Sequence, residues 1–149
     1  MLTSDVLRQI GTLSRSIHSI NDIQFKKYDL QRNQFIFLTR ICEHAGINQI
    51  SLSALLKVDK ATTTKAVQKL IEAGYIEKRR NDEDRREWNL YPLERARQVY
   101  EAIIAEENRA IGLCLAGFTD EEKAAVSTLI RRMSRNIEEE WKKFKSYKV

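Results

Sequence analysis

Apolar residues recur three or four positions apart through much of this chain, which is the spacing of one face of an α-helix. The pattern predicts one long amphipathic helix near the N-terminus and two more after Pro92, which opens the first of them. Gly117 and Phe118 separate these two, and Thr119 and Glu122 have the spacing of a capping box that begins the last helix. The apolar stripes are Leu7, Ile10, Leu13, Ile17 and Ile20, then Leu93, Ala96, Val99, Tyr100, Ile103, Ile104 and Ile111, and finally Val126, Leu129, Ile130, Met133, Ile137, Trp141 and Phe144.

Shorter helices are predicted in the middle of the chain, where residues typical of helix ends separate them. Gly46 suits the end of the first, and Gly74 suits the end of the third. Asn48 and Asp59 are good N-caps, because their side chains can accept hydrogen bonds from free backbone N–H groups. The predicted helices span about residues 32–45, 49–56 and 60–73.

A β-hairpin is predicted directly after these helices. Residues 75–80 and 87–91 are short strand candidates on either side of a polar segment, residues 81–84. This segment reads Asn-Asp-Glu-Asp, and Asn and Asp tolerate the backbone conformations of a tight turn. The order helix, turn, helix, hairpin is typical of a winged helix-turn-helix.

Composition agrees with a mainly helical protein that has a small β wing. The chain has 149 residues, of which 42% are apolar and 32% charged, with one Pro and five Gly. Its longest apolar runs fall short of the roughly 18 residues that span a bilayer, and no signal peptide is evident. We therefore expect a cytoplasmic protein without a membrane partner. The net charge of +5 weakly favours an anionic partner such as nucleic acid.

The long helices predict a second copy of the chain. Residues 30–92 are able to bury a small core of their own, but the helices in 1–29 and 93–149 carry more apolar face than one small lobe covers. A twofold homodimer would cover these faces. A monomeric helical bundle is the alternative.

The outer face of the predicted helix 60–73 is suited to a DNA major groove. Small residues near its start allow close approach to base edges, and its lysines can neutralise phosphates. The alternative is an ordinary solvated helix face. The candidate DNA-binding residues on this helix are Lys60, Ala61, Thr62, Thr64, Lys65, Gln68 and Lys69.

The hairpin adds cations beside that helix. Arg79, Arg80, Arg85 and Arg86 cluster there, and an arginine at a hairpin tip can enter an A·T-rich minor groove. We take Arg80, Arg85 and Arg86 as DNA-binding candidates and Asp84 as the carboxylate that orients an arginine. A salt-bridged surface turn is the alternative.

Three segments resemble the multiple antibiotic resistance regulator (MarR) family of winged-helix transcription factors. The segment LQRNQFIFL (30–38) resembles the family's LTxxQFxxL, and VDKATTTK (58–65) resembles the recognition-helix start VDKSTVTR. Asp84-Arg85-Arg86 matches the DxR wing tip. Two departures concern the junction after the wing, YPLERA (91–96) in place of LTxxG, and Ser53 and Thr63, where Ala and Val are usual.

The resemblance implies a single MarR-like domain over residues 1–149. It would combine a winged helix-turn-helix DNA-binding lobe (30–92) with a helical dimerisation lobe (1–29 plus 93–149) in an intertwined homodimer. It further implies a bacterial transcriptional regulator, expected to be a repressor, on a pseudo-palindromic double-stranded DNA operator. Arg86 would enter the minor groove while Thr62 and Lys65 face the major groove.

The resemblance also implies a cleft for a small-molecule effector that releases the operator. By position, its candidate lining residues are Ile17, His18, Tyr28, Phe35 and Cys42, although plain core packing is the simpler explanation for each of them.

We predict neither a cofactor nor a metal for this chain. Glu43-His44 resembles a ligand pair of zinc-responsive relatives, but the helix after Pro92 has no histidine to complete a tetrahedral site. The only cysteines, Cys42 and Cys114, are expected to be reduced, buried thiols.

Two other functions remain open on the sequence. A winged-helix protein-interaction module would use the same face to contact an acidic protein. An enzyme is disfavoured, because the sequence has no Gly-rich phosphate loop and no Ser/His/Asp or paired-carboxylate arrangement.

Overall fold

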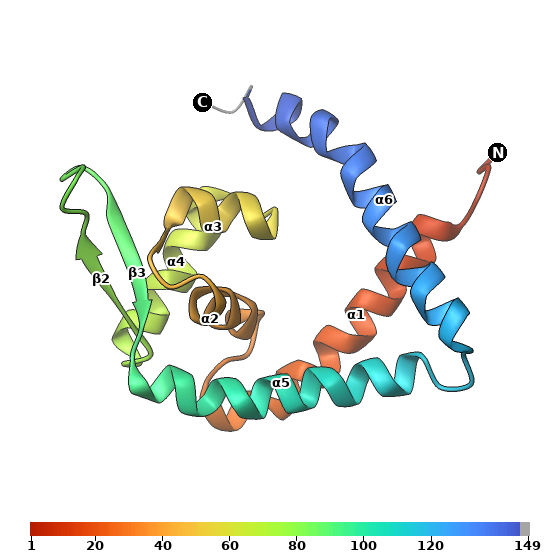
Figure 1. The fold of residues 1–149 in the computed structure, drawn as a ribbon, viewed down its shortest axis with the longest axis horizontal. Helices are drawn as coiled ribbons and strands as arrows, with labels where there is room; N and C mark the ends of the chain where they lie inside the picture. The colour runs from red at the N-terminus through yellow and green to blue at the C-terminus, as the bar shows by residue number, and fades with distance from the viewer. Residues whose placement is uncertain (147–149) are drawn as a thin grey trace. The chain divides into compact units, whose positions relative to one another are not determined.

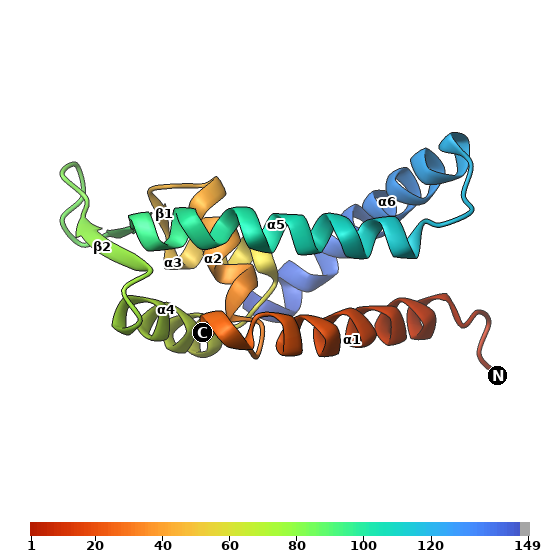
Figure 2. The same ribbon diagram turned by 90° about the horizontal axis from the view of Figure 1, so that it is seen from below.

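The computed structural model describes residues 1–146 (Figures 1 and 2). It is mostly helical with one small antiparallel sheet, as the sequence predicts. The chain divides into two compact units, residues 1–108 and residues 109–149. The first unit contains the winged helix-turn-helix elements and most of α5, and the second contains the end of α5 and α6. The elements are α1 (Val6–Gln24), the 3₁₀ helix η1 (Lys26–Tyr28), α2 (Gln34–Glu43), β1 (Ile47–Asn48), α3 (Gln49–Leu56), α4 (Lys60–Glu72), β2 (Ile76–Arg80), β3 (Trp88–Pro92), α5 (Glu94–Cys114) and α6 (Asp120–Ser146).

The connection from α1 to α2 differs from the prediction. Helix α2 begins at Gln34 rather than at residue 32, because Arg32 and Asn33 have left-handed φ angles of 55° and 65°. The backbone N–H of Arg32 instead donates to the Asp22 carboxylate at 2.8 Å. This bond ties the turn back to the last part of α1.

The sheet has the strand order β1–β3–β2, with both pairs antiparallel. The two-residue strand β1 was not predicted, since two residues are too few to show an alternating pattern. The prediction that Pro92 opens the long helix was wrong: Pro92 ends β3 opposite Ile76, and α5 begins at Glu94. The N–H of Leu93 donates to the Tyr75 carbonyl at 2.8 Å, which joins the wing to α5.

One hydrophobic core lies among α2, α3, α4, the sheet and the first turns of α5. The centres of the Phe25 and Phe35 rings lie 4.9 Å apart within this core. The Tyr75 hydroxyl donates to the Tyr28 carbonyl at 2.5 Å, so a polar tip inside this core has a partner. The buried apolar residues are Phe25, Leu30, Phe35, Phe37, Leu38, Ile41, Leu52, Ala66, Val67, Leu70, Tyr75, Ile76, Leu90, Ala96 and Ile103.

The outer helices expose much of their predicted apolar stripes. In α1, Leu7 is 70% exposed, and in α6, Ile137 is 62% exposed. The Thr119–Glu122 capping box at the start of α6 is confirmed, with reciprocal bonds of 3.0 and 3.1 Å. The prediction of a buried Cys114 was wrong, because this thiol is exposed at the end of α5. Within residues 1–146, we find no helix long and apolar enough to cross a membrane.

Candidate nucleic-acid interface

Two capping side chains define the helix-turn-helix formed by α3 and α4. The Asn48 carboxamide oxygen accepts from the Ser51 N–H at 2.8 Å and begins α3. Lys57 ends α3 in a left-handed conformation (φ 57°), which reverses the chain within three residues. Asp59 then begins α4. The caps and the turn occur where the sequence predicts them.

The Asp59 carboxylate also orients a candidate base-reading residue. One of its oxygens accepts from the Thr62 N–H at 2.8 Å, and the other accepts from the Thr62 hydroxyl at 3.0 Å. The hydroxyl proton of Thr62 is thereby committed to the cap. Its methyl group and the two lone pairs of its oxygen stay available at the exposed start of α4.

The two unusual core residues, Ser53 and Thr63, form a pair. The Ser53 hydroxyl donates to the Thr63 hydroxyl at 2.8 Å, and the Thr63 hydroxyl donates to the Asp59 carbonyl at 3.0 Å. Thr63 is fully buried, and Ser53 is 7% exposed. These bonds satisfy both buried hydroxyls and join α3 to the first turn of α4. The two departures from the usual Ala and Val are therefore compatible with burial, because each hydroxyl has the other as a partner.

The seven candidate residues of α4 are all exposed. The Thr64 hydroxyl donates to the Lys60 carbonyl at 2.9 Å and lies 3.2 Å from the Gln49 amide oxygen, so it also connects α4 to α3. The Gln68 amide donates to Glu72 at 3.1 Å. Among these residues, Lys65 extends from the middle of the exposed face, opposite the buried Ala66 and Val67.

The β2–β3 hairpin forms a wing that protrudes at one end of the first unit (Figures 1 and 2). At its tip, the Asp84 carboxylate accepts from the Arg86 backbone N–H at 3.1 Å and from its Nε at 3.3 Å. The Arg86 side chain is nevertheless 94% exposed, so this contact orients the guanidinium without hiding it. Arg85 is exposed beside it.

The other two hairpin arginines contact the wing itself. Arg79 forms an ion pair with Glu77, and its guanidinium lies 4.3 Å from the centre of the Tyr91 ring. The Arg80 guanidinium lies 5.0 Å from the centre of the Trp88 ring. These cation–π contacts stiffen the strands that carry the tip.

Comparisons with known proteins agree with this arrangement. The model of the MarR family matches residues 30–88. The uncharacterised HTH-type transcriptional regulator YybA of Bacillus subtilis is 38% identical over 138 residues, which cover 93% of this chain and 92% of the relative. The chain belongs to the MarR family. It is therefore a member of a family of transcriptional regulators.

Solved MarR structures have the same fold. A MarR protein from Peptoclostridium difficile is 56% identical, with a TM-score of 0.93 over 97% of this chain and 94% of its own. A MarR family transcriptional regulator from Listeria monocytogenes is 35% identical, with a TM-score of 0.94 over 97% of this chain and 96% of its own. That Listeria protein was solved in complex with a 26-mer DNA.

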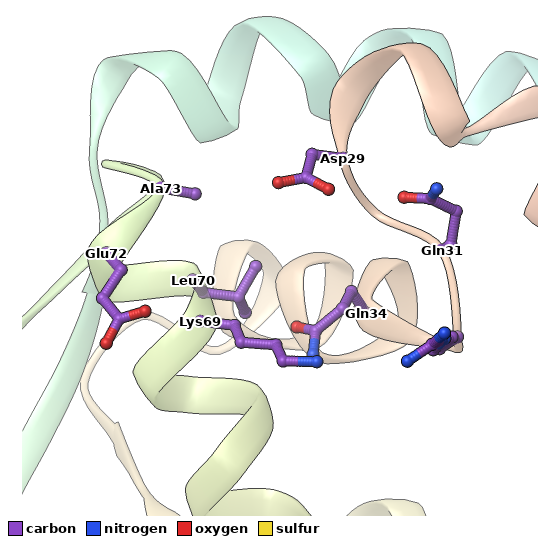
Figure 3. A pocket seen from close by; sticks show the side chains of 8 residues that line it. Asp29, Gln31, Gln34, Lys69, Leu70, Glu72 and Ala73 are labelled. Carbon is purple, nitrogen blue, oxygen red and sulfur yellow. The ribbon is translucent and has the colours of Figure 1, made fainter.

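The predicted effector cleft of this MarR chain remains a prediction. Phe35 is 3% exposed and packs in the core, whereas Ile17, His18, Tyr28 and Cys42 are partly exposed. A pocket of about 460 Å³ lies elsewhere, between the α1–α2 connection and the end of α4 (Figure 3). Its lining residues are Asp29, Gln31, Arg32, Gln34, Lys69, Leu70, Glu72 and Ala73.

The half-buried thiol of Cys42 is chemically quiet. Burial raises its pKa to about 11, against a smaller lowering by Arg97 and a further small rise from Glu43. A thiol with this pKa is almost entirely protonated near neutral pH and is a poor nucleophile. Among residues 1–146, no three His, Cys, Asp or Glu side chains come together in a way that would hold a metal ion.

The prediction from sequence missed three polar residues that connect the wing to the helix-turn-helix. The Asn48 amide and the Asn81 amide both donate to the Glu87 carboxylate. Asn48 was recognised only as a helix cap, Asn81 only as a turn residue, and Glu87 only as part of a strand. A carboxylate directly after the DxR motif was the available signal.

Proposed function

We propose that this MarR family chain is a homodimeric repressor that binds a pseudo-palindromic operator in double-stranded DNA. The observation that carries the proposal is the pairing of the exposed polar face of α4 with an exposed, carboxylate-oriented Arg86 on a wing of the same lobe. The fold it shares with the DNA-bound Listeria regulator supports this assignment.

In this proposal the two exposed surfaces contact different grooves. Thr62 and Lys65 face the major groove, where the Thr methyl suits a thymine methyl and the lysine suits a guanine edge or a phosphate. Arg86 enters the adjacent minor groove, with Asp84 holding its guanidinium. The remaining contacts are to the backbone and flanking bases, from Lys60, Ala61, Thr64, Gln68, Lys69, Arg80 and Arg85.

The dimer supplies the spacing between half-sites. The exposed apolar faces of α1 and α6 would pack against a second copy, so that two α4 helices reach successive major grooves about 10 base pairs apart. A small effector bound near Ile17, His18, Tyr28, Phe35 and Cys42 would shift this spacing and release the operator. The protein acts in the cytoplasm and has no catalytic role in this proposal.

The test compares two arginines of the same hairpin on operator DNA recovered by selecting bound genomic fragments. Arg86→Ala should weaken operator binding by about 1–3 kcal/mol, chiefly where the flanks are A·T-rich, because it removes the minor-groove contact. Arg79→Ala is the matched control: it removes the same charge, but Arg79 is engaged with Glu77 and Tyr91. Fluorescence anisotropy at several salt concentrations measures both.

Two outcomes would contradict the proposal. Equal losses in the two variants would remove the wing tip from the mechanism and leave only general charge. Absence of any sequence-selective DNA binding, together with a stable acidic protein partner, would instead favour a protein-interaction module.

A further inference from the structure

Glu87 lies at the junction between the wing and the helix-turn-helix, where the backbone pairing ends. The last pair between β1 and β3 is Asn48 with Asn89, so Glu87 is beyond that ladder. A pocket of about 370 Å³ lies here between the start of α3 and the wing. Side-chain packing leaves this junction partly open, and the hydrogen bond between Asn48 and Glu87 connects the wing to the start of α3 there.

The role of Asn48 as the N-cap of α3 fixes which end of its amide faces Glu87. The Asn48 carboxamide oxygen accepts from the Ser51 N–H at 2.8 Å, and a backbone N–H is only a donor. The amide nitrogen of Asn48 therefore faces the other way, where it donates to Glu87 Oε1. The capping of α3 decides the orientation of this amide.

Asn81 is oriented in the same manner on the other side of Glu87. Its carboxamide oxygen accepts from the Glu83 N–H at 2.8 Å and from the Asp84 N–H at 3.0 Å. Its amide nitrogen donates to Glu87 Oε2 at 3.0 Å. The wing turn thus decides the orientation of this second amide.

Because both amides donate, the side chain at position 87 needs two acceptor oxygens, which a carboxylate has. Both present donors to the side chain at position 87, and a carboxylate has an acceptor oxygen for each. A glutamine of the same shape has one acceptor oxygen, so its own N–H₂ group would face one of the two donors. Glu87, Asn48 and Asn81 are all partly buried, which raises the cost of such a mismatch.

The network continues to the wing arginine. Asn81 holds the Asp84 backbone N–H, and the Asp84 carboxylate accepts from Arg86 Nε at 3.3 Å. A continuous set of contacts thus runs from the N-cap of α3, through Glu87 and Asn81, to the residue proposed to enter the minor groove.

We propose that Glu87 is a positioning residue that sets where Arg86 stands relative to the α3–α4 pair, and so contributes to operator selectivity. This inference rests on the proposed DNA-binding function. A carboxylate near the DNA-binding side repels phosphates and lowers affinity for every sequence. Glu87 therefore lowers the affinity for DNA of any sequence but increases the preference for the operator over other DNA.

The test measures the ratio of affinities for the operator and for a scrambled duplex of equal length, using the full chain. Glu87→Gln removes the negative charge, so binding to the scrambled duplex should strengthen slightly. The ratio of operator affinity to scrambled-duplex affinity should fall about tenfold, because Arg86 is no longer held in place. Glu83→Gln is the matched control, because it removes the same charge at the same turn. It should change both affinities alike and leave the ratio unaltered.

A reciprocal swap distinguishes hydrogen bonding from charge. In Asn81→Asp/Glu87→Gln, the new carboxylate at position 81 still accepts from the turn N–H groups and also accepts from the glutamine amide. The glutamine oxygen remains for Asn48, so the network closes again at the wild-type net charge. The swap should restore the affinity ratio to within about twofold of wild type, whereas Asn81→Asp alone should not raise it.

The outcomes separate the two proposals. Wild-type selectivity in Glu87→Gln, or failure of the swap to restore the ratio at an unchanged melting temperature, would overturn the role of Glu87 alone. If the wild-type chain shows no sequence-selective binding, the proposed function itself is wrong and this inference falls with it.

Discussion

The part of the chain around residues 25–103 and helix α6 use their apolar residues in opposite ways. The first contains every member of the hydrophobic core, including Leu38 and Leu52 at 0% exposure. Among the described residues of α6, none is buried, and Leu129 and Phe144 are 51% and 66% exposed. Both regions were recognised from the same helical periodicity.

The difference teaches that periodicity identifies an apolar face but does not say what covers it. In the first region, short helices and a sheet converge and cover one another. In α6, four of the seven apolar residues of the stripe are exposed, namely Leu129, Ile130, Ile137 and Phe144, and such a continuous apolar face is typical of an interaction surface. We attribute the cover to a second copy, in line with the proposed homodimer.

Disrupting the α6 face should have the largest effect. Leu129→Glu/Ile137→Glu places two charges per chain, four per dimer, in the proposed contact and should weaken association by about 6–12 kcal/mol, since each of the four buried side chains contributes about 1.5–3 kcal/mol. Size-exclusion chromatography with light scattering should show monomers. Thr128→Glu/Arg135→Ala, on exposed polar positions of α6, makes the same formal charge change and should remain dimeric. Dimers in both variants would exclude this face from the interface.

Truncating a core leucine should act on folding rather than on association. Leu38→Ala should lower the free energy of unfolding by about 2–5 kcal/mol, because Leu38 is fully buried and leaves a cavity. Leu55→Ala makes the same change at a side chain that is 45% exposed and should cost much less. Urea unfolding followed by circular dichroism measures both. Similar losses at the two positions would contradict the burial that separates them.

The alkylation rate of the Cys42 thiol should show the burial of this residue in the same region. With its pKa raised from 9.0 to about 11, the thiolate fraction at pH 8 falls about 100-fold, and alkylation should slow accordingly. Iodoacetamide labelling of a Cys114→Ser variant isolates this thiol, and the same variant unfolded in urea is the reference. The rate should keep rising with pH up to about 11, the folded-state value. Equal rates in the folded and unfolded chain would show that burial does not suppress this thiolate.

The Ser53–Thr63 pair should give the smallest effect and a distinctive pattern. Ser53→Ala should cost about 1 kcal/mol, whereas Thr63→Val should cost about 1–3 kcal/mol because it leaves the Ser53 hydroxyl buried without its acceptor. The double variant should cost less than the sum of the two. A thermal or urea double-mutant cycle measures the coupling. Strict additivity would mean that the hydroxyls do not depend on each other.

Much of the winged lobe was predictable because its signals are local. Asn48 and Asp59 begin helices at the predicted positions, since a capping side chain bonds to an N–H two or three residues away. The Asp84–Arg86 contact was predictable for the same reason. Cys114 and Pro92 were misplaced because neither position depends on local pattern alone. Cys114 lies at the end of α5, where periodicity does not show whether another element covers the thiol, and Pro92 is held by sheet pairing with Ile76.

The sequence by itself determined most of the helices, the hairpin, the caps and the family, because each depends on residues close together in the chain or on short motifs. Only the tertiary structure decided that Asn48 and Asn81, which lie 33 positions apart, meet on one carboxylate, and that Ser53 and Thr63 satisfy each other. Such contacts depend on where the backbone brings separate elements together. The type of a residue and its neighbours in the sequence do not show which distant residues will lie close to it in space.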